Sequence, residues 1–562
     1  MRKLISCVPN FSEGRDEAVI TAITGEVETV DGVKLLDVDP GQATNRTVVT
    51  FVGEPEAVIE SAVRAIRKAA ELIDMSQHSG AHPRFGATDV CPLVPVSGVT
   101  MEETVEYARQ LAQRLGDELD LTVYCYENAA TSPERSNLAV VRQGEYEGLE
   151  AKLEDPAWQP DYGPATFNPK SGATAVGARD FLVAYNVNLN TTSKRRANSV
   201  AFDVREKGRP KRIGDPIVGD LVYDENGEKV YVPGSLKGVK GIGWFIEEYG
   251  ICQISMNLTN ISETPIHVAF DEVARKADAR GIRVTGSELV GLIPLQAMLD
   301  AGRHYLRKQR RSTGVSDAEL IKIAVKSMGL DELAPFDPAQ KIIEYAIDDR
   351  DDRLVDRSVK AFTEETASES VAPGGGSVAA TIGALGAALA TMVANLSSHK
   401  RGWDGRWEEF SNWAEKGKAA HDELLSLVDA DTDAFNGIMA ASRLPGRTEE
   451  EKAARNQAVQ AAIRQAIDVP FRVMEVSLAA MDVIEAMVVS GNPASVSDAG
   501  VGALCVRSAV MGAYLNVQIN VGDLEDKAAA QSYLQRGAAI HERAIEREAE
   551  IMAMVDAKLS GG

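Results

Sequence analysis

The sequence predicts a multi-domain protein in which two α/β subdomains precede an all-α helical bundle. The chain has 562 residues, more than one ordinary hydrophobic core accommodates. Up to about residue 335, short runs of β-branched and aromatic residues alternate with amphipathic helical stretches, and from residue 358 onward the pattern is helical and rich in alanine. We therefore expect subdomains at 1–180 and 181–335, a linker at 336–357 and a helical domain at 358–562.

Residues 1–180 are expected to follow the order β-α-β-β-α-β-α-β. The runs LISCVP, VKLLDV, RTVVTFV, ATDVCPLVPV and LTVYCY predict strands at 4–9, 33–38, 46–52, 87–96 and 121–126. Amphipathic spacing predicts helices at 16–30, 54–73 and 101–115. This order resembles the ferredoxin-like, split βαβ layout, in which helices cover one face of a mixed sheet.

Residues 181–335 repeat the alternation, so we expect a second ferredoxin-like subdomain. Strands are predicted at 181–189, 241–248, 251–258 and 282–286, and helices at 200–205 and 265–280. Asn226 and Gly227 stand between two β-rich runs, which is a strong hairpin signal. We assign this hairpin to an insertion at about 213–233.

The charged stretch IDDRDDRLVDRS, at 347–358, marks the linker to the helical domain. The five or six helices after it are predicted to break where Pro and Gly occur, at 373–376, 445–446, 491–493 and 522–523. Residues 377–396 are uncharged over about 20 residues, the length of a membrane span. Their Gly and Ala content instead favours close packing against neighbouring helices, so no membrane partner is expected.

The composition restricts the classes of partner. The net charge of −23 and the pI near 4.9 disfavour nucleic acid and anionic lipid surfaces. The five cysteines are odd in number and scattered without a CxxC pair, so neither a disulfide framework nor a zinc cluster is predicted. The stretch MRKLISCVPNFSEG lacks the apolar run of a secretory signal. These features favour a cytoplasmic protein.

Two histidines, His78 and His82, have the i, i+4 spacing of two metal ligands on a helix. Gly80 and Pro83 disfavour a continuous helix there, so we expect no metal site. A histidine on a loop ahead of a strand has a pKa near neutrality and can accept and return a proton. The alternative is a ring that only caps or hydrogen-bonds the loop.

Polar residues gather where the first predicted strands end, at Asn10, Asp39, Asn45 and Arg46. Loop residues at one edge of a sheet commonly build a ligand cleft. Within NFSEG, a helix cap through Ser12 is an equally good interpretation. The loop GPATFNPKSG, at 163–172, is punctuated by two prolines and two glycines and is either a linker or a binding element.

In the helical domain, LLSLVDADTDAF places Leu424, Val428, Asp431 and Phe435 on one helical face. Burial without a cation raises the pKa of a carboxylate and suits it to proton transfer, although a salt-bridged core aspartate would have the same pattern. APGGGS, at 372–377, resembles a phosphate-binding loop but lacks the lysine of a nucleotide-binding motif. Other polar residues, which either bind substrate or satisfy buried backbone, are Asn492, Ser497, Asp498, Asn516 and Asn520.

Motifs along nearly the whole chain are similar to those of the formiminotransferase-cyclodeaminase family, namely CVPNFSEG, LLDVDPG, TNRTVVTFVG, HPRFGATDVCPLVPV, VKGIGWFIEE, GSELVGLIPLQAMLDA, APGGGSVAA, VDADTDAF and GAYLNVQIN. The resemblance implies a bifunctional folate enzyme of histidine degradation. Its first domain transfers the formimino group from N-formimino-L-glutamate to N5 of tetrahydrofolate. Its second domain cyclises 5-formimino-tetrahydrofolate to 5,10-methenyl-tetrahydrofolate and releases ammonia.

The resemblance also implies site residues. It gives the general base of the transferase as His82 and the active-site aspartate of the cyclodeaminase as Asp431. It gives the folate-binding loop as Gly163, Pro164, Ala165, Thr166, Phe167, Asn168, Pro169, Lys170, Ser171 and Gly172. Our own candidates for substrate binding, with Arg46 as a carboxylate ligand, are Asn10, Asp39, Asn45, Arg46, Gly375, Ser377, Asn492, Ser497, Asp498 and Asn516.

Further expectations follow from the resemblance. Tetrahydrofolate is the implied cosubstrate, in polyglutamylated form, with no metal and no nucleotide, and a homodimer or higher homo-oligomer binds it between subunits. The chain departs from the family at the 213–233 insertion and at Ala81, where members often carry an acidic residue that would favour a protonated His82. His78 has no assigned role. The alternative function is a transferase acting on 5-formyl-tetrahydrofolate or another N-substituted glutamate, with a helical domain serving only folate binding and oligomerisation.

Overall fold

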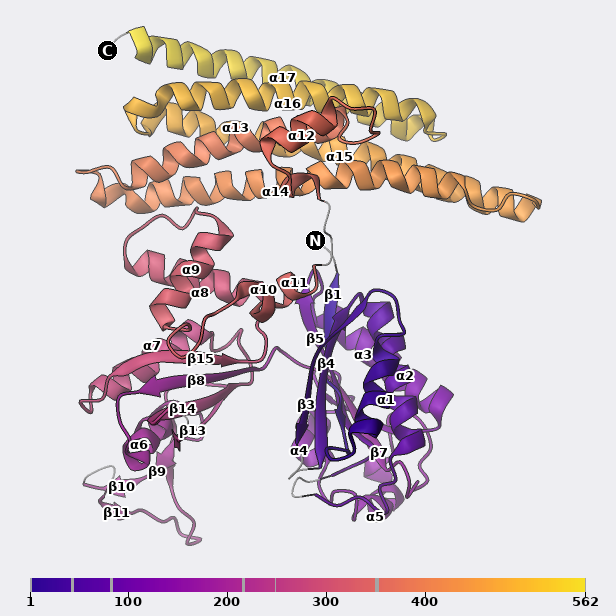
Figure 1. The fold of residues 1–562 in the computed structure, drawn as a ribbon, viewed down its shortest axis with the longest axis vertical. Helices are drawn as coiled ribbons and strands as arrows, with labels where there is room; N and C mark the ends of the chain where they lie inside the picture. The colour runs from indigo at the N-terminus through magenta and orange to yellow at the C-terminus, as the bar shows by residue number, and fades with distance from the viewer. Residues whose placement is uncertain are drawn as a thin grey trace. The chain divides into compact units, whose positions relative to one another are not determined.

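The computed structural model describes residues 3–41, 45–80, 84–214, 218–247, 249–348 and 353–560. An α/β region is followed by a helical region, which confirms the predicted order of fold classes (Figure 1). The chain divides into two compact units. The first comprises Met1–Met298 with Met328–Asp348, and the second Leu299–Ser327 with Asp349–Gly562.

The first half of the α/β unit is built on a seven-stranded mixed sheet. Its strands are β1 (Leu4–Cys7), β2 (Asn10–Phe11), β3 (Val33–Gly41), β4 (Arg46–Gly53), β5 (Thr88–Ser97), β6 (Thr122–Glu127) and β7 (Ala173–Ala178). The strand order is β1-β4-β2-β5-β7-β6, β3 pairs with β4, and β1 also pairs with β5. β7 runs parallel to both β5 and β6, and the other pairings are antiparallel.

The sequence did not predict β7. Its residues, ATAVGA, are all buried, but Ala and Gly are poor strand formers. Its position between β5 and β6 supplies the pairing that the local sequence does not. The short helices α4 (Leu138–Val141) and α5 (Leu149–Glu154) were also missed, and they enclose a small core that includes Phe85 and Tyr124.

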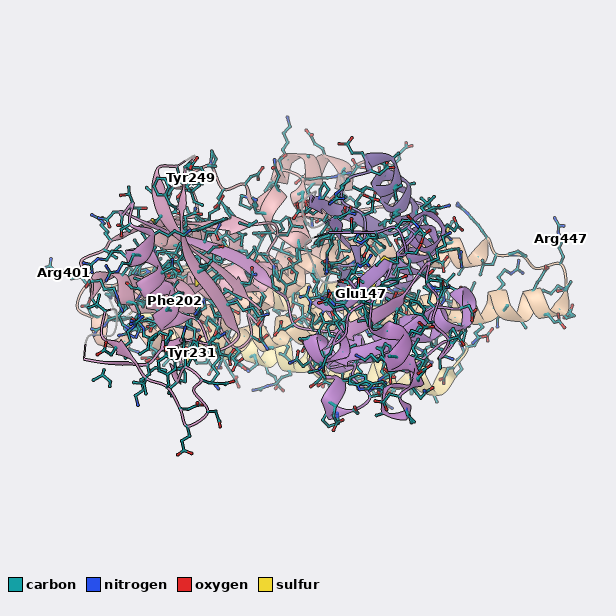
Figure 2. All side chains as sticks on the ribbon, turned by 90° about the horizontal axis from the view of Figure 1, so that it is seen from below. Glu147, Phe202, Tyr231, Tyr249, Arg401 and Arg447 are labelled. Carbon is teal, nitrogen blue, oxygen red and sulfur yellow. The ribbon has the colours of Figure 1, made fainter. Side chains whose placement is uncertain are left out.

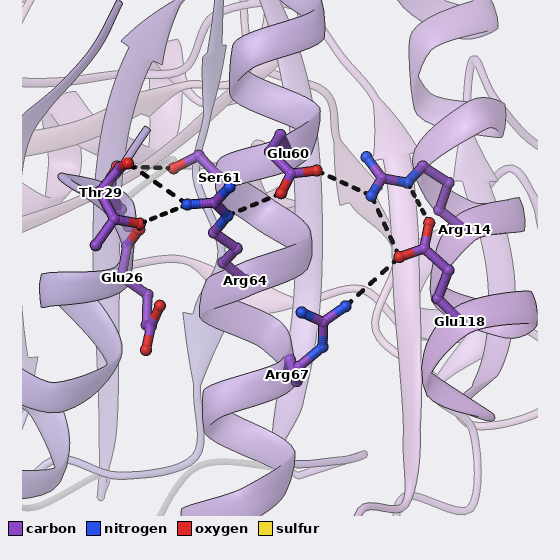
Figure 3. A network of polar contacts seen from close by, with 9 residues as sticks. Glu26, Thr29, Glu60, Ser61, Arg64, Arg67, Arg114 and Glu118 are labelled. Atoms are coloured by element: carbon purple, nitrogen blue, oxygen red, sulfur yellow. Dashed lines mark hydrogen bonds and ion pairs between the residues drawn. The ribbon is translucent and has the colours of Figure 1, made fainter. Parts of the chain in front are cut away.

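Three helices, α1 (Glu17–Val27), α2 (Pro55–Leu72) and α3 (Met101–Leu119), pack against the sheet around one apolar core. Their exposed faces are joined by ion pairs (Figure 3). Glu60 of α2 accepts from Arg64 at 2.8 Å and from Arg114 of α3 at 2.9 Å, and Arg64 also donates to the Thr29 hydroxyl at 3.1 Å. These contacts are solvent-exposed, so they fix the alignment of the helices more than they stabilise the fold.

The second half of the α/β unit has a four-stranded antiparallel sheet of order β13-β14-β8-β15. Along the chain its elements are β8 (Val183–Leu189), α6 (Lys194–Val204), β13 (Val239–Ile246), β14 (Ile251–Leu258), α7 (Ile266–Asp278) and β15 (Val284–Val290). Helix α6 begins earlier than predicted because the Ser193 side chain accepts from the Arg196 backbone and caps it.

Between α6 and β13, short strand pairs occupy the predicted insertion. They are β9 (Arg209–Pro210) with β12 (Tyr231–Val232), and β10 (Arg212–Ile213) with β11 (Asp220–Leu221). The chain reverses at Asn226 and Gly227, where the Asp224 carboxylate accepts from the Asn226 N–H at 2.9 Å. Near the base of the insertion, the Lys207 ammonium lies 5.2 Å from the ring centroid of Tyr231 (Figure 2).

The long helices of the helical unit are α13 (Gly375–Ser398), α14 (Trp407–Ser442), α15 (Glu449–Ser490), α16 (Val496–Asn520) and α17 (Lys527–Ser560), preceded by the short α12 (Val359–Thr366). The breaks predicted at 445–446, 491–493 and 522–523 lie between them, whereas the break at 399–406, between α13 and α14, was not predicted. Small residues of α13 permit the close approach that the sequence predicts. A Cβ on Gly383 would lie 2.8 Å from the Ser477 hydroxyl of α15, and one on Gly386 would lie 2.8 Å from the Gly502 carbonyl of α16.

Two described segments, Gly375–Ser398 and Pro493–Asp523, are long and apolar enough to cross a membrane by length and composition alone. Within their most apolar windows, 61% and 44% of the residues are buried inside the protein. The same test is passed by core helices, and the packing of α13 against its neighbours accounts for its composition.

The helical unit also includes Leu299–Ser327, which the sequence did not group with it. This segment holds the end of α8 (Leu295–Lys308) and most of α9 (Asp317–Met328). It is tied to the bundle by the Thr313 N–H, which donates to Ser411 at 3.0 Å, and by Lys418, which donates to Asp317 at 2.8 Å. These contacts are between residues about a hundred positions apart, so local patterning did not reveal them.

Candidate active sites

Asp431 lies near the middle of α14, at the edge of its apolar face. Leu424 and Val428 are buried as predicted, and Asp431 is half-buried. Phe435 is 43% exposed, so the prediction that it continues the buried face is wrong. Ala434 is buried instead, although Phe435 lies on the same stripe as Leu424 by the 3.6-residue spacing.

The Asp431 carboxylate meets the first turn of α13. Its Oδ2 accepts from the backbone N–H of Ser377 at 2.9 Å and from the Ser377 hydroxyl at 3.1 Å. Gly376 makes this approach possible, since a Cβ there would lie 2.1 Å from Asp431 Oδ1. An anion at a helix N-terminus is also favoured by the helix dipole.

Burial nevertheless dominates the protonation of this group. Desolvation raises the pKa of Asp431 above its ordinary value, and the two hydrogen bonds from Ser377 oppose this rise without cancelling it. Among the described residues, no ion pair involves Asp431, and its hydrogen bonds are those from Ser377. The salt-bridged alternative is therefore not what this part of the chain shows. A raised pKa keeps more of the acid form present at a given pH, so this carboxyl group can both give and accept a proton.

Three predicted binding residues surround Asp431. Ser377 contacts the carboxylate directly, and a Cβ on Gly375 would lie 3.4 Å from the Asn516 amide of α16. The Asn516 amide itself donates to the Gly512 carbonyl at 2.9 Å. Asp431, Gly375, Ser377 and Asn516 are thus brought together by three helices.

A cavity of about 660 Å³ lies on another side of α14, and none of the four residues of this cluster lines it. Its lining comes from α14, from the segment before α12 and from the segment before α13, namely Asp429, Thr432, Asp433, Asn436, Arg353, Leu354, Arg357, Ser370, Val371 and Ala372. The Thr432 hydroxyl is buried and has no hydrogen-bond partner within the described chain. A buried hydroxyl in that state is costly unless a ligand or water satisfies it.

Asn492, Ser497 and Asp498 are not part of this cluster within one chain. The Asn492 N–H donates to the Ser397 hydroxyl at 2.8 Å, at the far end of α13 from Ser377. Twenty residues of helix separate the two serines, a distance of about 30 Å. The amide of Asn520 donates to the Ala466 carbonyl at 2.7 Å. Of the two roles predicted for Asn520, this contact matches the one in which it satisfies a buried backbone group.

In the α/β unit, Asn10 and Arg46 form one polar cluster with Asp89. Arg46 donates to the Asn10 side-chain oxygen from Nε at 3.0 Å and from Nη2 at 2.8 Å, and its Nη1 pairs with the buried Asp89 carboxylate. Arg142 also reaches Asp89, at 3.1 Å. Burial lowers the pKa of Arg46, and Asp89 opposes that change. No sequence pattern marked Arg142, which lies in a segment without a recognisable motif.

Asn45 connects the neighbouring loops. It has a left-handed backbone, its amide accepts from the Gly14 N–H at 3.0 Å, and it donates to the Ser79 carbonyl at 3.0 Å. The carbonyl of Asn45 lies 2.8 Å from His78 Nε2, so Nε2 carries a proton and His78 positions the loop. His82 falls in residues 81–83, outside the described residues, so its prediction is not tested here.

Two further predictions in this region have clear outcomes. The Ser12 hydroxyl donates to the Gly86 carbonyl at 2.7 Å, and α1 is capped by Asp16, so the helix-cap interpretation of Ser12 is wrong. Asp39 lies on β3 and is exposed. The register places it opposite Val48, two residues from Arg46 along β4.

The 163–172 loop is closely fitted to the sheet. Gly163 has a φ of 77°, and a Cβ there would lie 1.9 Å from the Leu121 carbonyl. At its other end the loop bonds both sides of the segment that contains His82: the Met75 N–H donates to the Lys170 carbonyl at 2.9 Å, and the Ala87 N–H to the Ser171 carbonyl at 2.8 Å. The loop is therefore a fixed element beside that segment.

Within the described residues, no group of three or more His, Cys, Asp or Glu side chains is arranged to hold a metal ion.

Comparison with known proteins gives consistent matches along the chain. The formiminotransferase domain, N-terminal subdomain, matches residues 4–179, the formiminotransferase domain matches 184–348, and formiminotransferase-cyclodeaminase matches 358–539. A formimidoyltransferase-cyclodeaminase from Mus musculus is 42% identical over 560 residues, covering 99% of this chain and 100% of that protein.

Two shorter relatives match parts of the chain. A glutamate formimidoyltransferase from Streptococcus pyogenes serotype M1 is 39% identical over 307 residues, covering 55% of this chain and 94% of that protein. A methenyltetrahydrofolate cyclohydrolase from Methylorubrum extorquens is 36% identical over 178 residues, covering 32% of this chain and 86% of that protein.

Proposed function

This chain belongs to the formimidoyltransferase-cyclodeaminase family, and from this premise we propose which of its residues carry the two reactions. The protein is a bifunctional enzyme of histidine degradation. It transfers the formimino group from N-formimino-L-glutamate to N5 of tetrahydrofolate. It then cyclises 5-formimino-tetrahydrofolate to 5,10-methenyl-tetrahydrofolate with release of ammonia. We assign the first reaction to residues 1–335 and the second to 358–562.

We infer that His82 is the general base of the transfer. The N5 nitrogen must lose a proton as it attacks the formimino carbon, and the glutamate nitrogen must gain one as it leaves. One imidazole can do both. Support comes from the loop at 163–172, which is bonded to Met75 and Ala87 on either side of His82 in the chain. We assign folate binding to that loop.

Asn10, Asn45 and Arg46 are proposed to bind the substrate carboxylates beside this loop, with Asp39 at the edge. The Arg46 guanidinium is oriented by Asn10 and Asp89, and Arg142 adds positive charge at the same place. Charge-assisted bonds from oriented guanidinium groups recognise carboxylates well. Ala81 stands where family members often carry an acidic residue, so His82 has no carboxylate at that neighbouring position of the sequence. Without that negative charge the imidazolium of His82 would lose its proton more easily.

Asp431 is proposed as the proton carrier of the cyclodeaminase. As N10 attacks the formimino carbon, the carboxylic acid protonates the formimino nitrogen, and the carboxylate then accepts the proton that N10 loses. The same proton is returned to the amino group as it leaves as ammonia, and the C–N5 double bond forms. The observation that carries this assignment is a carboxyl whose burial raises its pKa and which makes no ion pair in the described chain. Gly375, Ser377 and Asn516 are proposed to bind the folate there.

Several finer features are also proposed. The cosubstrate is polyglutamylated tetrahydrofolate, with neither metal nor nucleotide, and the protein is cytoplasmic without a nucleic-acid or membrane partner. It forms a homodimer or larger homo-oligomer, a proposal supported by Leu515 and Ile519 of α16, which are 66% and 73% exposed. In an oligomer Asn492, Ser497 and Asp498 would serve a site shared with another subunit. Both α/β halves are proposed to be ferredoxin-like, on the support of the β8-α6-β13-β14-α7-β15 order.

The test is to supply the purified protein with N-formimino-L-glutamate and tetrahydrofolate. Formation of methenyl-tetrahydrofolate together with an equal amount of ammonia requires both activities. Formation of 5-formimino-tetrahydrofolate without ammonia would leave only the transferase, and no consumption of formiminoglutamate would refute the proposal.

A further inference from the structure

The second sheet of the α/β unit has a polar centre on the face turned away from its helices. Tyr185, Val187 and Leu189 of β8 are buried in the core. Alternate residues of a strand point to opposite faces, so Asn186 and Asn188 lie on the other side. The register sets Asn188 beside Gln253 of β14, and Asn186 beside Glu288 of β15. We call Asn186, Asn188, Gln253 and Glu288 the amide–glutamate cluster.

Two of the three amides donate to one carboxylate oxygen of Glu288, and the third, Asn188, donates to Glu332. Asn186 and Gln253 donate from their amide nitrogens to Glu288 Oε2, at 3.1 and 3.2 Å. Gln253 also donates to the Asn188 oxygen at 2.9 Å. The three amides are 7%, 0% and 1% exposed, whereas Glu288 is half-buried. Buried amides therefore hold an accessible carboxylate in one orientation.

Fold stability does not account for this arrangement. In the described part of the chain no ion pair involves Glu288, and an uncompensated carboxylate with restricted access to water is unfavourable. On the same face Ile242 and Trp244 of β13 are apolar and exposed, whereas Ser255 and Lys240 are polar. An oriented carboxylate beside exposed apolar side chains is typical of a ligand-binding face.

The same face leads to a cationic cavity. Ser255 and Ile242 continue the row that begins at Glu288 and Asn186, and both line a cavity of about 640 Å³. Its charged lining residues are Arg205, Lys207, Lys240 and Glu206, so positive charge is in excess. Three strand spacings separate Glu288 from Ile242, about 14 Å. The face thus offers a carboxylate at one end and positive charge at the other.

We propose that Glu288, held by Asn186 and Gln253, binds a planar N–C–N fork of a transferase substrate. Oε2 already accepts from Asn186 and Gln253, so Oε1 is the oxygen left to accept from the two N–H groups of the fork, as a carboxylate oxygen can from a guanidinium. The proposal rests on the function proposed above, whose two substrates both carry a fork: the 2-amino and N3 edge of the pterin, and the formimino group of formiminoglutamate. Tetrahydrofolate is long enough to place its glutamate carboxylates in the cationic cavity, whereas formiminoglutamate carries its carboxylates only a few bonds away. The pterin is therefore the expected source.

Glu288 is proposed as a substrate-binding residue, and binding measurements on the full chain test it. The Kd values for tetrahydrofolate and for formiminoglutamate are measured separately by calorimetry, for the wild type, Glu288→Gln and Glu288→Asp. Loss of a charge-assisted pair should raise the Kd for tetrahydrofolate about tenfold or more in both variants and leave formiminoglutamate unchanged. As a matched control, Glu272→Gln removes a carboxylate of α7 from the same half and should change neither Kd.

The outcomes separate this proposal from the proposed function. A raised Kd for formiminoglutamate alone would support binding of an N–C–N fork by Glu288 but would overturn the assignment of that fork to the pterin. Unchanged Kd values for both ligands in both variants would overturn the proposal, even where the wild type transfers the formimino group normally. Ring closure of supplied 5-formimino-tetrahydrofolate depends on the helical unit and should stay at the wild-type rate in every variant, which verifies that this unit is folded. The Kd that keeps its wild-type value verifies in the same way that the α/β unit is folded.

Discussion

Replacing Gly376 by alanine should disable ring closure by displacing a carboxylate that the substitution does not alter chemically. A Cβ at position 376 would lie 2.1, 2.5 and 2.6 Å from Oδ1, Cγ and Oδ2 of Asp431. All three distances are shorter than real carbon contacts, so the carboxyl group must move. Its bonds to the Ser377 N–H and hydroxyl, at 2.9 and 3.1 Å, then lengthen or break.

The size of the effect can be worked from these contacts. Alanine gains about 1 kcal/mol over glycine in helix propensity, which is offset by the loss of hydrogen bonds to a carboxylate worth about 1.5–3 kcal/mol. Net stability should therefore change by no more than about 2 kcal/mol. A misplacement of about 1 Å costs a reaction about a hundredfold. We expect the rate of ring closure to fall about a hundredfold, with the transferase rate unchanged.

The assay supplies 5-formimino-tetrahydrofolate and follows methenyl-tetrahydrofolate and ammonia. Gly437→Ala, in the same helix as Asp431, is the matched control, because a Cβ there meets nothing within 4 Å. It should leave ring closure unchanged. If Gly376→Ala acts only through the carboxylate, adding it to Asp431→Ala should cause no further loss. Wild-type ring closure in Gly376→Ala would refute the geometry that we assign to Asp431.

The other predictions concern each site and the assembly. His82→Ala should abolish formimino transfer while supplied 5-formimino-tetrahydrofolate is still cyclised; loss of both activities would mean that His82 maintains the fold. Because the acid form of Asp431 is required, the rate of ring closure should fall as pH rises through its raised pKa, and a rate that rises instead would reverse its role. A raised pKa also means that the folded state binds the proton more tightly, so stability present below that pKa is lost as pH rises through it. Asp431→Asn should therefore raise Tm relative to the wild type at alkaline pH only, and an equal gain at acidic pH would exclude this cause. Ile519→Glu should reduce the oligomer size measured by light scattering, because it places a charge on an exposed apolar helix face, whereas an unchanged mass would remove that face from the interface.

Local sequence patterns predicted the helices and strands whose own residues favour that secondary structure. Three breaks between long helices fall where Pro and Gly predicted them, although Pro470 lies inside α15 without ending it. The 3.6-residue spacing placed Asp431 beside buried Leu424 and Val428. Phe435 shows the limit of this argument. The spacing gives the face of the helix on which a residue lies, but not whether a neighbouring element covers that face. The composition of β7 gave no strand signal, because its pairing partners β5 and β6 determine its structure.

Clusters that depend on strand register could not be predicted from local sequence patterns. Asn186 and Asn188 alternate in YNVNL as polar residues on a solvent-facing strand would. Only the pairing of β8 with β14 and β15 brings them to Gln253 and Glu288, which lie at least 65 residues away. Likewise, Arg142 joins Arg46 at Asp89 through tertiary structure alone.

The account depends on two proton carriers housed in separate parts of the chain, and Asp431→Ala tests their separation most directly. With N-formimino-L-glutamate and tetrahydrofolate supplied together, formiminoglutamate, 5-formimino-tetrahydrofolate and ammonia are measured in one time course. The account predicts that formiminoglutamate is consumed at the wild-type rate, that 5-formimino-tetrahydrofolate accumulates in equal amount, and that ammonia release falls about a hundredfold or more. Ammonia released at the wild-type rate would contradict it.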